Sequence, residues 1–307
     1  MDARLQQLSY SSRLTLHSCP RKYQLYKLNA AVQEDDDPTS VTFAFGHTVG
    51  AGIQEYLVSG DSNKALMAAY LTWAPDLFAE NTKQIKSFWL AVAAIQRFIS
   101  LCNNGFLKDW QVATFDGQPA VELGFKITLP DGFIYIGFAD VVLVHKVTGE
   151  VMVLELKTTS ATNVVAAMYK NSAQAIGYSI VLDAVIPGLS AYTVKYLIYK
   201  TKSFDYEVMD FGKSYLQRAL WIKELLLDIE RVARYAEDDI FPMHGESCNS
   251  FFRECEYFGV CTMATPLITK PFTTELADQL SKKLDGIQIS VHISDLIQAQ
   301  LDKEIEE

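Results

Sequence analysis

The chain has 307 residues, of which 49% are hydrophobic, and a formal net charge of −10 at pH 7. This length and apolar content suffice for one large core, or for one core with a helical insertion. No apolar run approaches the about 18 residues needed to span a bilayer, which argues against a helical membrane protein. The excess of acid argues against a broad DNA-binding surface, because phosphate binding favours basic residues.

The first residues, Met1-Asp2-Ala3-Arg4, contain no basic segment and no apolar signal core. Nothing in them indicates secretion, so we expect a cytoplasmic protein whose cysteines are reduced. Under these conditions a set of cysteines is more suited to binding metal than to forming disulfides.

Apolar residues at 3.6-residue spacing predict a helical N-terminal part. A short helix that holds Cys19 comes first. The helices expected next run from about Phe45 to Leu57, Asn63 to Ala79 and Thr82 to Cys102. We expect this helical block, about residues 43–110, to form a wall over a site built on the strands that follow.

Runs of β-branched and aromatic residues predict strands in the middle of the chain. The expected elements are strands near 119–129, 133–144 and 151–157, a helix from about Asn163 to Ala184, strands near 191–200 and 204–211, and a helix at 213–237. This order favours an α/β fold in which helices flank a mixed central β-sheet.

A predicted hairpin brings three charged side chains together. The turn residues Thr148-Gly149-Glu150 separate the strand that contains Asp140 from the strand that contains Glu155 and Lys157. Because side chains alternate along a strand, Glu155 and Lys157 share one face. Two adjacent carboxylates repel each other unless they share a proton or bind a hard divalent cation such as Mg²⁺ or Mn²⁺.

Lys157 favours the cation, because an ammonium beside a metal can orient a water nucleophile and offset charge that grows in a phosphoryl transition state. The sequence thus indicates metal-assisted hydrolysis of phosphodiesters, with Asp140, Glu155 and Lys157 as the catalytic residues. The alternative is an ordinary exposed pair of Glu155 and Lys157 on an edge strand.

Four of the five cysteines form a second candidate site. Cys248, Cys255 and Cys261 are close in sequence, whereas Cys19 is near the other end of the chain. Four thiolates can hold an iron–sulphur cubane or zinc, although zinc sites favour tighter spacings. Cys102 lies in an apolar helical stretch and is expected to be a buried thiol.

These segments together resemble the PD-(D/E)XK nuclease superfamily, in particular its RecB-like branch with an iron–sulphur cluster. The matching segments are Leu8-Ser9-Tyr10-Ser11-Ser12 with Cys19-Pro20-Arg21-Lys22-Tyr23, Asp140 with Glu155-Leu156-Lys157, Gln174-Ala175-Ile176-Gly177-Tyr178, and the three later cysteines. They follow the family's order up to about Thr262. The resemblance implies a restriction-endonuclease-like core with a helical insertion.

The resemblance also implies roles for individual residues. Asp140, Glu155 and the backbone carbonyl of Leu156 would bind Mg²⁺ or Mn²⁺. Lys157 would serve the attacking water.

Further roles follow for the helix and the cysteines. Gln174 and Tyr178, one helical turn apart, would border the active site and contact DNA, although half-buried packing would also explain Tyr178. A [4Fe-4S] cluster would clasp the N- and C-terminal parts through Cys19, Cys248, Cys255 and Cys261.

One position departs from the family pattern. RecB-like nucleases carry a metal-binding His four residues after a Gly on a helix, and Gly50 stands there after Gly46. His47, Gln54 or Glu55 lies one helical turn from Gly50 and could reach the same metal. This departure leaves the number of metals open, and it is compatible with a weakened enzyme.

The resemblance divides the chain into a nuclease domain, residues 1–262, and an acidic C-terminal tail or appendage, residues 263–307. The nuclease domain would contain a catalytic core at about 119–211 and a cluster segment at 248–261. Basic side chains that remain for a local groove are Arg13, Arg21, Lys22, Lys195, Lys200 and Lys202.

We therefore expect a metal-dependent DNA exonuclease that acts on ends or single strands in recombination, repair or end-processing. The resemblance to CRISPR-adaptation-type and bacteriophage nucleases places it in a bacterial cell or the bacterial host of a virus. Partners would be DNA and, in addition, a helicase, recombinase or replication protein. The alternatives are a feeble DNA-end-binding subunit of a larger complex and a structure-selective endonuclease.

Overall fold

The computed structural model describes residues 1–28, 41–73, 86–185, 192–250 and 253–264. The chain divides into two units, Met1–Thr262 and Met263–Glu307. Apart from its first two residues, the second unit lies outside the described residues, and so does the predicted acidic tail. The elements and sites described here belong to the first unit.

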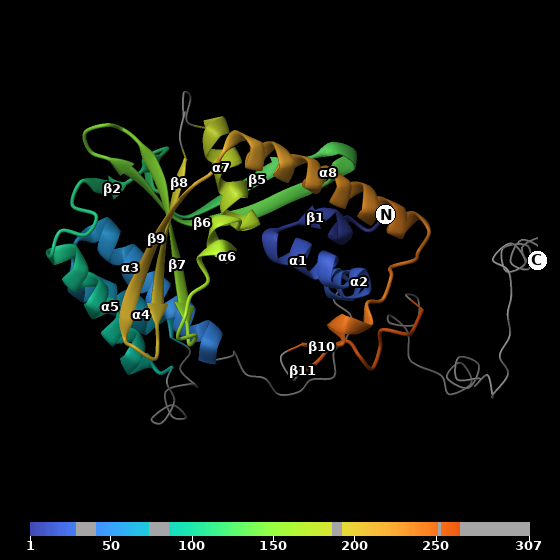
Figure 1. The fold of residues 1–307 in the computed structure, drawn as a ribbon, viewed down its shortest axis with the longest axis horizontal. Helices are drawn as coiled ribbons and strands as arrows, with labels where there is room; N and C mark the ends of the chain where they lie inside the picture. The colour runs from blue at the N-terminus through green and yellow to red at the C-terminus, as the bar shows by residue number, and fades with distance from the viewer. Residues whose placement is uncertain (29–40, 74–85, 186–191, 251–252, 265–307) are drawn as a thin grey trace, which may run out of the picture. The chain divides into compact units, whose positions relative to one another are not determined.

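Seven of the described strands form a mixed sheet, shown in Figure 1. The strands are β1 (Gln7–Leu8), β2 (Trp110–Val112), β5 (Val121–Thr128), β6 (Ile134–His145), β7 (Val151–Thr159), β8 (Thr193–Lys200) and β9 (Asp205–Gly212). Their order is β1-β6-β7-β8-β9, and β2 and β5 also pair with β6. β7 and β8 are parallel, whereas β6–β7 and β8–β9 are antiparallel. The predicted mixed sheet is confirmed.

Two small hairpins lie outside this sheet. They are formed by β3 (Thr114–Phe115) with β4 (Gln118–Pro119), and by β10 (Asn249–Ser250) with β11 (Arg253–Glu254).

Helices cover both faces of the sheet, as predicted (Figure 1). The described α-helices of the chain are α1 (Tyr10–Ser18), α2 (Pro20–Lys27), α3 (Val41–Ser59), α4 (Ser62–Thr72), α5 (Phe88–Asn103), α6 (Ala166–Lys170), α7 (Ala173–Val185) and α8 (Tyr215–Glu237). Ser9 and Ser214 form capping boxes at the starts of α1 and α8. Such caps satisfy backbone N–H groups that would otherwise lack partners in the first turn. The predicted extensions of α4 to Ala79 and of α5 back to Thr82 lie largely outside the described residues.

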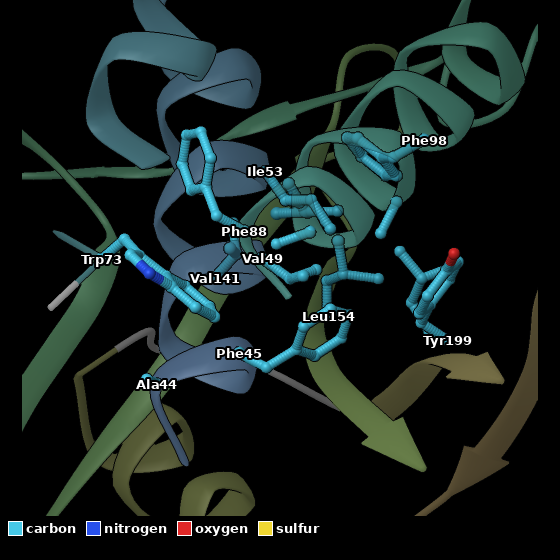
Figure 2. Packing of buried hydrophobic residues seen from close by; sticks show 14 of the residues in the cluster. Ala44, Phe45, Val49, Ile53, Trp73, Phe88, Phe98, Val141, Leu154 and Tyr199 are labelled. Atoms are coloured by element: carbon cyan, nitrogen blue, oxygen red, sulfur yellow. The ribbon is translucent and has the colours of Figure 1, made fainter. Parts of the chain in front are cut away.

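The largest core cluster lies between the sheet and helices α3 and α5 (Figure 2). Phe45, Val49 and Ile53 of α3 occupy one helix face and pack against Leu154 of β7 and Tyr199 of β8. On the opposite face of the sheet, α7 packs its own apolar side against β6, β7 and β8. This burial fixes α3 against the end of β7, where the candidate site lies.

Two predicted helices are each divided into two in the structure, the first at Pro20 and the second after Lys170. Cys19 is not inside a helix but is the extended residue between α1 and α2. Pro20 explains this, because proline fits the first turn of a helix and disfavours helical geometry in the residue before it.

The predicted helix from Asn163 to Ala184 is two helices, α6 and α7. Lys213 Nζ donates to the carbonyl oxygens of Tyr169 and Lys170 at 3.2 and 2.6 Å. These bonds satisfy the last carbonyls of α6, so the helix can end there at little cost. Burial of Lys213 lowers its pKa to about 8.

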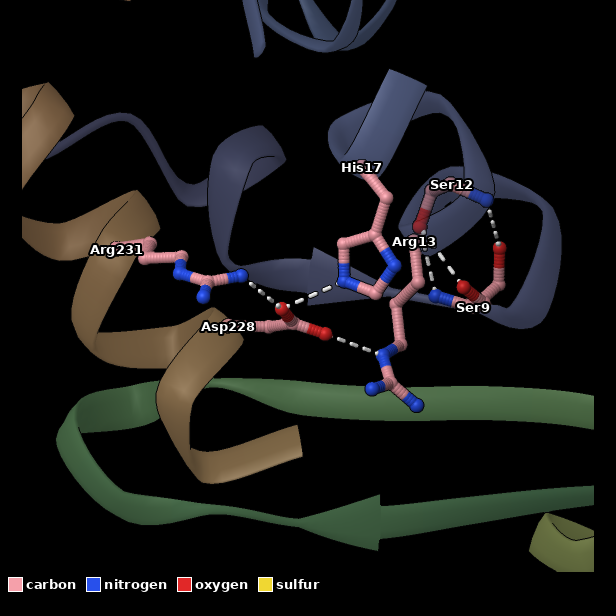
Figure 3. A network of polar contacts seen from close by, with 6 residues as sticks. All are labelled: Ser9, Ser12, Arg13, His17, Asp228 and Arg231. Carbon is pink, nitrogen blue, oxygen red and sulfur yellow. Dashed lines mark hydrogen bonds and ion pairs between the residues drawn. The ribbon is translucent and has the colours of Figure 1, made fainter. Parts of the chain in front are cut away.

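A buried ion pair fastens α1 to α8 (Figure 3). Arg13 Nε lies 2.6 Å from Asp228 Oδ2, and His17 Nε2 lies 2.7 Å from Asp228 Oδ1. The Arg13 guanidinium also lies over the Trp221 ring, 5.2 Å from its centroid. The N-terminal segment is therefore held to the last described helix by charge as well as by packing.

Candidate active site

The candidate site lies where β6 and β7 separate. Their ladder runs from the pair Val144 and Val151 to the pair Val141 and Leu154, whereas β7 stays paired with β8 as far as Thr159. Beyond Leu154 the β6 side of β7 therefore has backbone groups free for other partners. The Leu156 N–H donates to Asp140 Oδ2 at 2.7 Å across this opening. The predicted placement of Asp140 beside the strand of Glu155 is what the structure has.

Glu155 and Lys157 share one face of β7 and form an ion pair. Lys157 Nζ lies 2.6 Å from Glu155 Oε1. Glu155 is 1% exposed, so the pair is not an exposed one on an edge strand. Glu155 Oε2 makes no hydrogen bond of normal geometry among the described residues, although the Tyr178 hydroxyl is near enough to favour the charged carboxylate.

Burial and mutual repulsion shift the pKa values of the two carboxyls. Burial raises the pKa of Asp140, and the charge of Glu155 raises it further. Burial likewise raises the pKa of Glu155, while the Lys157 ammonium acts in the opposite direction. Burial would lower the pKa of Lys157, but the carboxylates of Glu155 and Asp140 outweigh it and raise the value. Lys157 thus stays an ammonium, which can stabilise negative charge but cannot accept a proton.

Gln174 links the ion pair to Tyr178. Gln174 Oε1 accepts from Lys157 Nζ at 3.3 Å, and Gln174 Nε2 donates to the Tyr178 hydroxyl at 2.6 Å. Gln174 is half-buried, whereas Tyr178 is 3% exposed and its ring lies 6.0 Å from that of Phe125. Tyr178 is therefore buried in the core, and the expected contact of Gln174 and Tyr178 with DNA stays a prediction.

An open cleft of about 540 Å³ lies between α3 and the strand ends. The strands contribute Glu122, Asp140, Leu156, Lys157 and Thr158 to it. The cleft connects the acidic and basic groups of the site to solvent.

Helix α3 contributes a stripe of residues at helical spacing to the same cleft. They are Phe43, Gly46, His47, Gly50 and Gln54. A Cβ added at Gly50 would meet nothing within 4 Å, so this position leaves space beside the carboxylates. Of the three residues proposed to replace the missing His, His47 and Gln54 line the cleft, whereas Glu55 is not among the described residues that do.

Glu122 is a residue of the cleft that the sequence reasoning missed. It lies opposite Asp140 in the register of β5 and β6, between the pairs Val121 with Val141 and Leu123 with Ala139. Its φ of 47° is in the left-handed region, which costs energy for a residue with a side chain. The charge of Glu122 raises the pKa values of both Asp140 and Glu155.

Gln54 fixes the position of Glu122. Its Nε2 atom donates to Glu122 Oε1 at 2.7 Å and to the carbonyl oxygen of Asp140 at 3.3 Å. The signal in the sequence was an acidic residue within a predicted strand, but its place opposite Asp140 depends on the register of β5 with β6.

The basic groove expected from the sequence is largely neutralised. Lys195 pairs with Asp210 at 2.7 Å and Lys200 pairs with Glu207 at 2.9 Å, both across β8 and β9. Lys22 pairs with Glu256. The two arginines expected there are buried, Arg13 against Asp228 and Arg21 with its Nε donating to the Cys261 carbonyl at 2.9 Å.

The cysteine residues expected to hold a cluster surround one cavity. Cys19, Cys248, Cys255 and Cys261 all line it, together with the buried Arg21. These thiols are free, as is Cys102, whose pKa is raised to about 11 by burial against the α3–α5 core. The region between α1 and α2 and the segment after α8 therefore line one cavity, and the cluster expected to join them stays a prediction.

Among the described residues, no set of three or more His, Cys, Asp or Glu side chains is arranged to hold a single metal ion. No described helix is long and apolar enough to cross a bilayer.

Comparison with known proteins places this geometry in a family. Residues 7–262 match the model of the PD-(D/E)XK nuclease superfamily. No curated protein matches the chain. Among solved structures, the chain is similar to a protein described as a candidate exonuclease from Eubacterium rectale. The two chains have 12% sequence identity and a TM-score of 0.50, and the match covers 96% of this chain and 94% of that one.

A second solved structure, that of SSO0001, has 14% identity and a TM-score of 0.29 over 81% of this chain and 96% of that chain, which is too low to support an argument. The family model spans the strands, the cleft and the cysteine cavity. The chain belongs to the PD-(D/E)XK nuclease superfamily.

Proposed function

We propose that the chain is a divalent-metal-dependent DNA exonuclease of the RecB-like branch, acting on DNA ends or single strands in recombination, repair or end-processing. One observation carries this proposal: Asp140 is bonded to the Leu156 backbone at the opening between β6 and β7, beside the Lys157 ammonium and within an open cleft. Membership of the superfamily supports hydrolysis of phosphodiesters.

The residues of this opening suit Mg²⁺ or Mn²⁺. The N–H and C=O of one residue in an extended strand point to the same side, so the Leu156 carbonyl faces the same opening as its N–H. That carbonyl, the Asp140 carboxylate and Glu155 Oε2 are hard oxygen donors. Burial and neighbouring acidic charges raise the pKa values of both carboxyls, and a bound cation would offset these charges. A bound ion would polarise a phosphoryl oxygen and acidify a water molecule.

The protein groups have distinct roles in this proposal. Asp140, Glu155 and the Leu156 carbonyl hold the ion, and the Lys157 ammonium offsets the charge that grows on the phosphate oxygens. Gln174 keeps Lys157 in place through its 3.3 Å contact. Tyr178 positions Gln174 from within the core.

A nuclease assay tests the proposal. The assay measures the cleavage of labelled single-stranded and duplex DNA by wild type, Glu155→Ala and Lys157→Ala, each in Mg²⁺, Mn²⁺ or EDTA. The matched control is Lys108→Ala, which changes an exposed lysine outside the cleft. We expect Lys157→Ala to lose about 10²- to 10³-fold in rate, as for other charge-stabilising groups. Equal activity in all four proteins would remove the enzyme proposal.

We also propose a [4Fe-4S] cluster on Cys19, Cys248, Cys255 and Cys261. A tetrahedral zinc site would need its sulphur atoms about 3.8 Å apart, given Zn–S bonds of about 2.3 Å. What supports the cluster is that all four cysteines line one cavity, since four thiolates are the ligand set of a [4Fe-4S] cluster.

Metal analysis and absorbance of the purified protein test the cluster. We expect iron and sulphide with broad absorbance near about 400 nm, lost in Cys19→Ser and kept in Cys102→Ser. Colourless protein that contains zinc would reject this assignment. Cys19→Ser should also unfold at a lower temperature than Cys102→Ser, because only the former breaks a link between distant segments.

A feeble or inactive DNA-end-binding subunit is the second candidate. The open space at Gly50 and the ion pairs of Lys195 and Lys200 favour it. It predicts DNA binding without cleavage in either metal, which the same assay detects.

A further inference from the structure

An exposed aromatic side chain lies in the cleft on its α3 side. Phe43 is 62% exposed, and its ring centroid lies 4.2 Å from that of His47, with the ring planes at 54°. Both side chains line the same cleft as Asp140 and Lys157. A phenylalanine ring gains free energy when a ligand covers it, so its exposure beside the reactive groups indicates a ligand contact.

The position of this aromatic pair is fixed by the core. A Cβ added at Gly46 would lie 3.6 Å from Thr158 Oγ1, so α3 passes close to the residue after Lys157. Phe45 is fully buried and stacks on Tyr199 of β8, with ring centroids 6.3 Å apart. Phe43 is thus presented from a rigid helix, and little conformational freedom is lost when a ligand binds.

The charges of the molecule favour a source of DNA affinity in addition to phosphate contacts. The net charge is −10, and Lys195, Lys200 and Lys22 are each paired with an acidic side chain. Each paired lysine must give up its carboxylate before it can neutralise a phosphate. Base stacking avoids this cost, because it uses the face of the base and not the phosphate.

We propose that Phe43, with His47 beside it, is a stacking platform for an unpaired base of the strand whose phosphate enters the cleft. Within an intact duplex both faces of every internal base are covered and only the last pair exposes one face, so a single strand or a frayed end offers far more free base surface. The substrate class is then single-stranded DNA of any sequence, since every base has an aromatic face. This inference rests on the proposed nuclease function and specifies its substrate.

Binding of a labelled oligonucleotide by fluorescence anisotropy tests the inference. The full chain is titrated with single-stranded DNA and with the matching duplex, in Ca²⁺ without Mg²⁺ or Mn²⁺, at several salt concentrations. The proteins are wild type, Phe43→Ala, Phe43→Tyr and the control Tyr215→Ala. Tyr215 is also exposed but lies on α8, outside the residues that line the cleft.

We expect Phe43→Ala to bind single strands about 5- to 100-fold more weakly, and Phe43→Tyr and Tyr215→Ala to remain within about twofold of wild type. Duplex affinity should be nearly unchanged in all of them. The slope of log affinity against log salt should be the same for Phe43→Ala and wild type, because stacking releases no counterions. Thermal unfolding of Phe43→Ala should match wild type, since the side chain is exposed.

Three results would overturn the stacking platform while the nuclease function stands: single-strand affinity of Phe43→Ala equal to that of Tyr215→Ala, an equal loss on duplex, or a changed salt slope. If wild type cleaves no DNA in Mg²⁺ or Mn²⁺, the nuclease function itself fails, and it does so in an assay independent of Phe43.

Discussion

Removal of the Asp228 carboxylate should cost more stability than any surface charge of the chain. The Arg13 and Asp228 side chains are 5% and 1% exposed and lie 2.6 Å apart. In Asp228→Ala the guanidinium stays buried in α1 without its counter-charge, and breaking such a pair typically costs about 3–5 kcal/mol. For a domain of this size each kcal/mol lowers the Tm by about 2–4 °C, so we expect a fall of about 6–20 °C.

The matched control is Asp205→Ala, which removes an exposed ion pair. Arg97 Nε lies 3.1 Å from Asp205 Oδ1, but the two side chains are 45% and 51% exposed, so the loss should be about 0–1 kcal/mol. Replacement of both buried partners, Arg13→Met with Asp228→Leu, should recover most of the stability, because no unpaired charge remains. Thermal and urea unfolding measure all three proteins. An Asp228→Ala shift no larger than that of Asp205→Ala would refute this reasoning.

Three further predictions concern the cleft. Folding raises the pKa values of Asp140 and Glu155, so the metal-free protein should lose stability as pH rises through these values. Asp140→Asn should flatten this pH dependence of stability, measured by thermal melts in EDTA between about pH 5 and about pH 9. An unchanged slope of stability against pH would contradict the pKa shift. Gly50→His should bind Mn²⁺ more tightly than wild type in calorimetric titrations, because the imidazole has room in the cleft. The same substitution should raise the stability of the protein by about 0.5 kcal/mol through helix propensity. Weaker Mn²⁺ binding would show that another group needs this space. Glu122→Gln should weaken Mn²⁺ binding about 10-fold, since it removes a carboxylate that faces Asp140; unchanged affinity would exclude Glu122 from the site.

The sequence predicted five of the seven strands of the described sheet, all but β1 and β2. It also predicted the meeting of Asp140 with the strand of Glu155, which follows from alternation along β6 and β7 and from a short turn. It also predicted the four cysteines that line one cavity, although from a family resemblance and not from spacing alone. The strands and the hairpin depend on local pattern, which a sequence carries directly.

Other features depend on partners that are distant in sequence. The end of α6 depends on Lys213, which donates to carbonyls more than 40 residues earlier. The neutralised groove depends on the register of β8 and β9, which sets Lys195 opposite Asp210. The position of Glu122 opposite Asp140 depends on the register of β5 with β6. Spacing along one segment contains no information about any of these contacts.

The path of the chain around Cys19 could have been predicted more accurately. Pro20 marks the start of α2, and the preference of proline for the first helical turn separates this helix from α1. Cys19 is thereby placed in extended backbone, with its sulphur in the cavity shared with the later cysteines.

Crystals soaked in Mn²⁺ and measured at the manganese absorption edge test the metal site most directly. The account predicts an anomalous peak in the opening between β6 and β7, about 2.0–2.2 Å from an Asp140 carboxylate oxygen and from the Leu156 carbonyl oxygen. The proposed metal site would be contradicted if protein that cleaves DNA bound an ordered ion elsewhere, with Asp140 still hydrogen-bonded only to the Leu156 N–H.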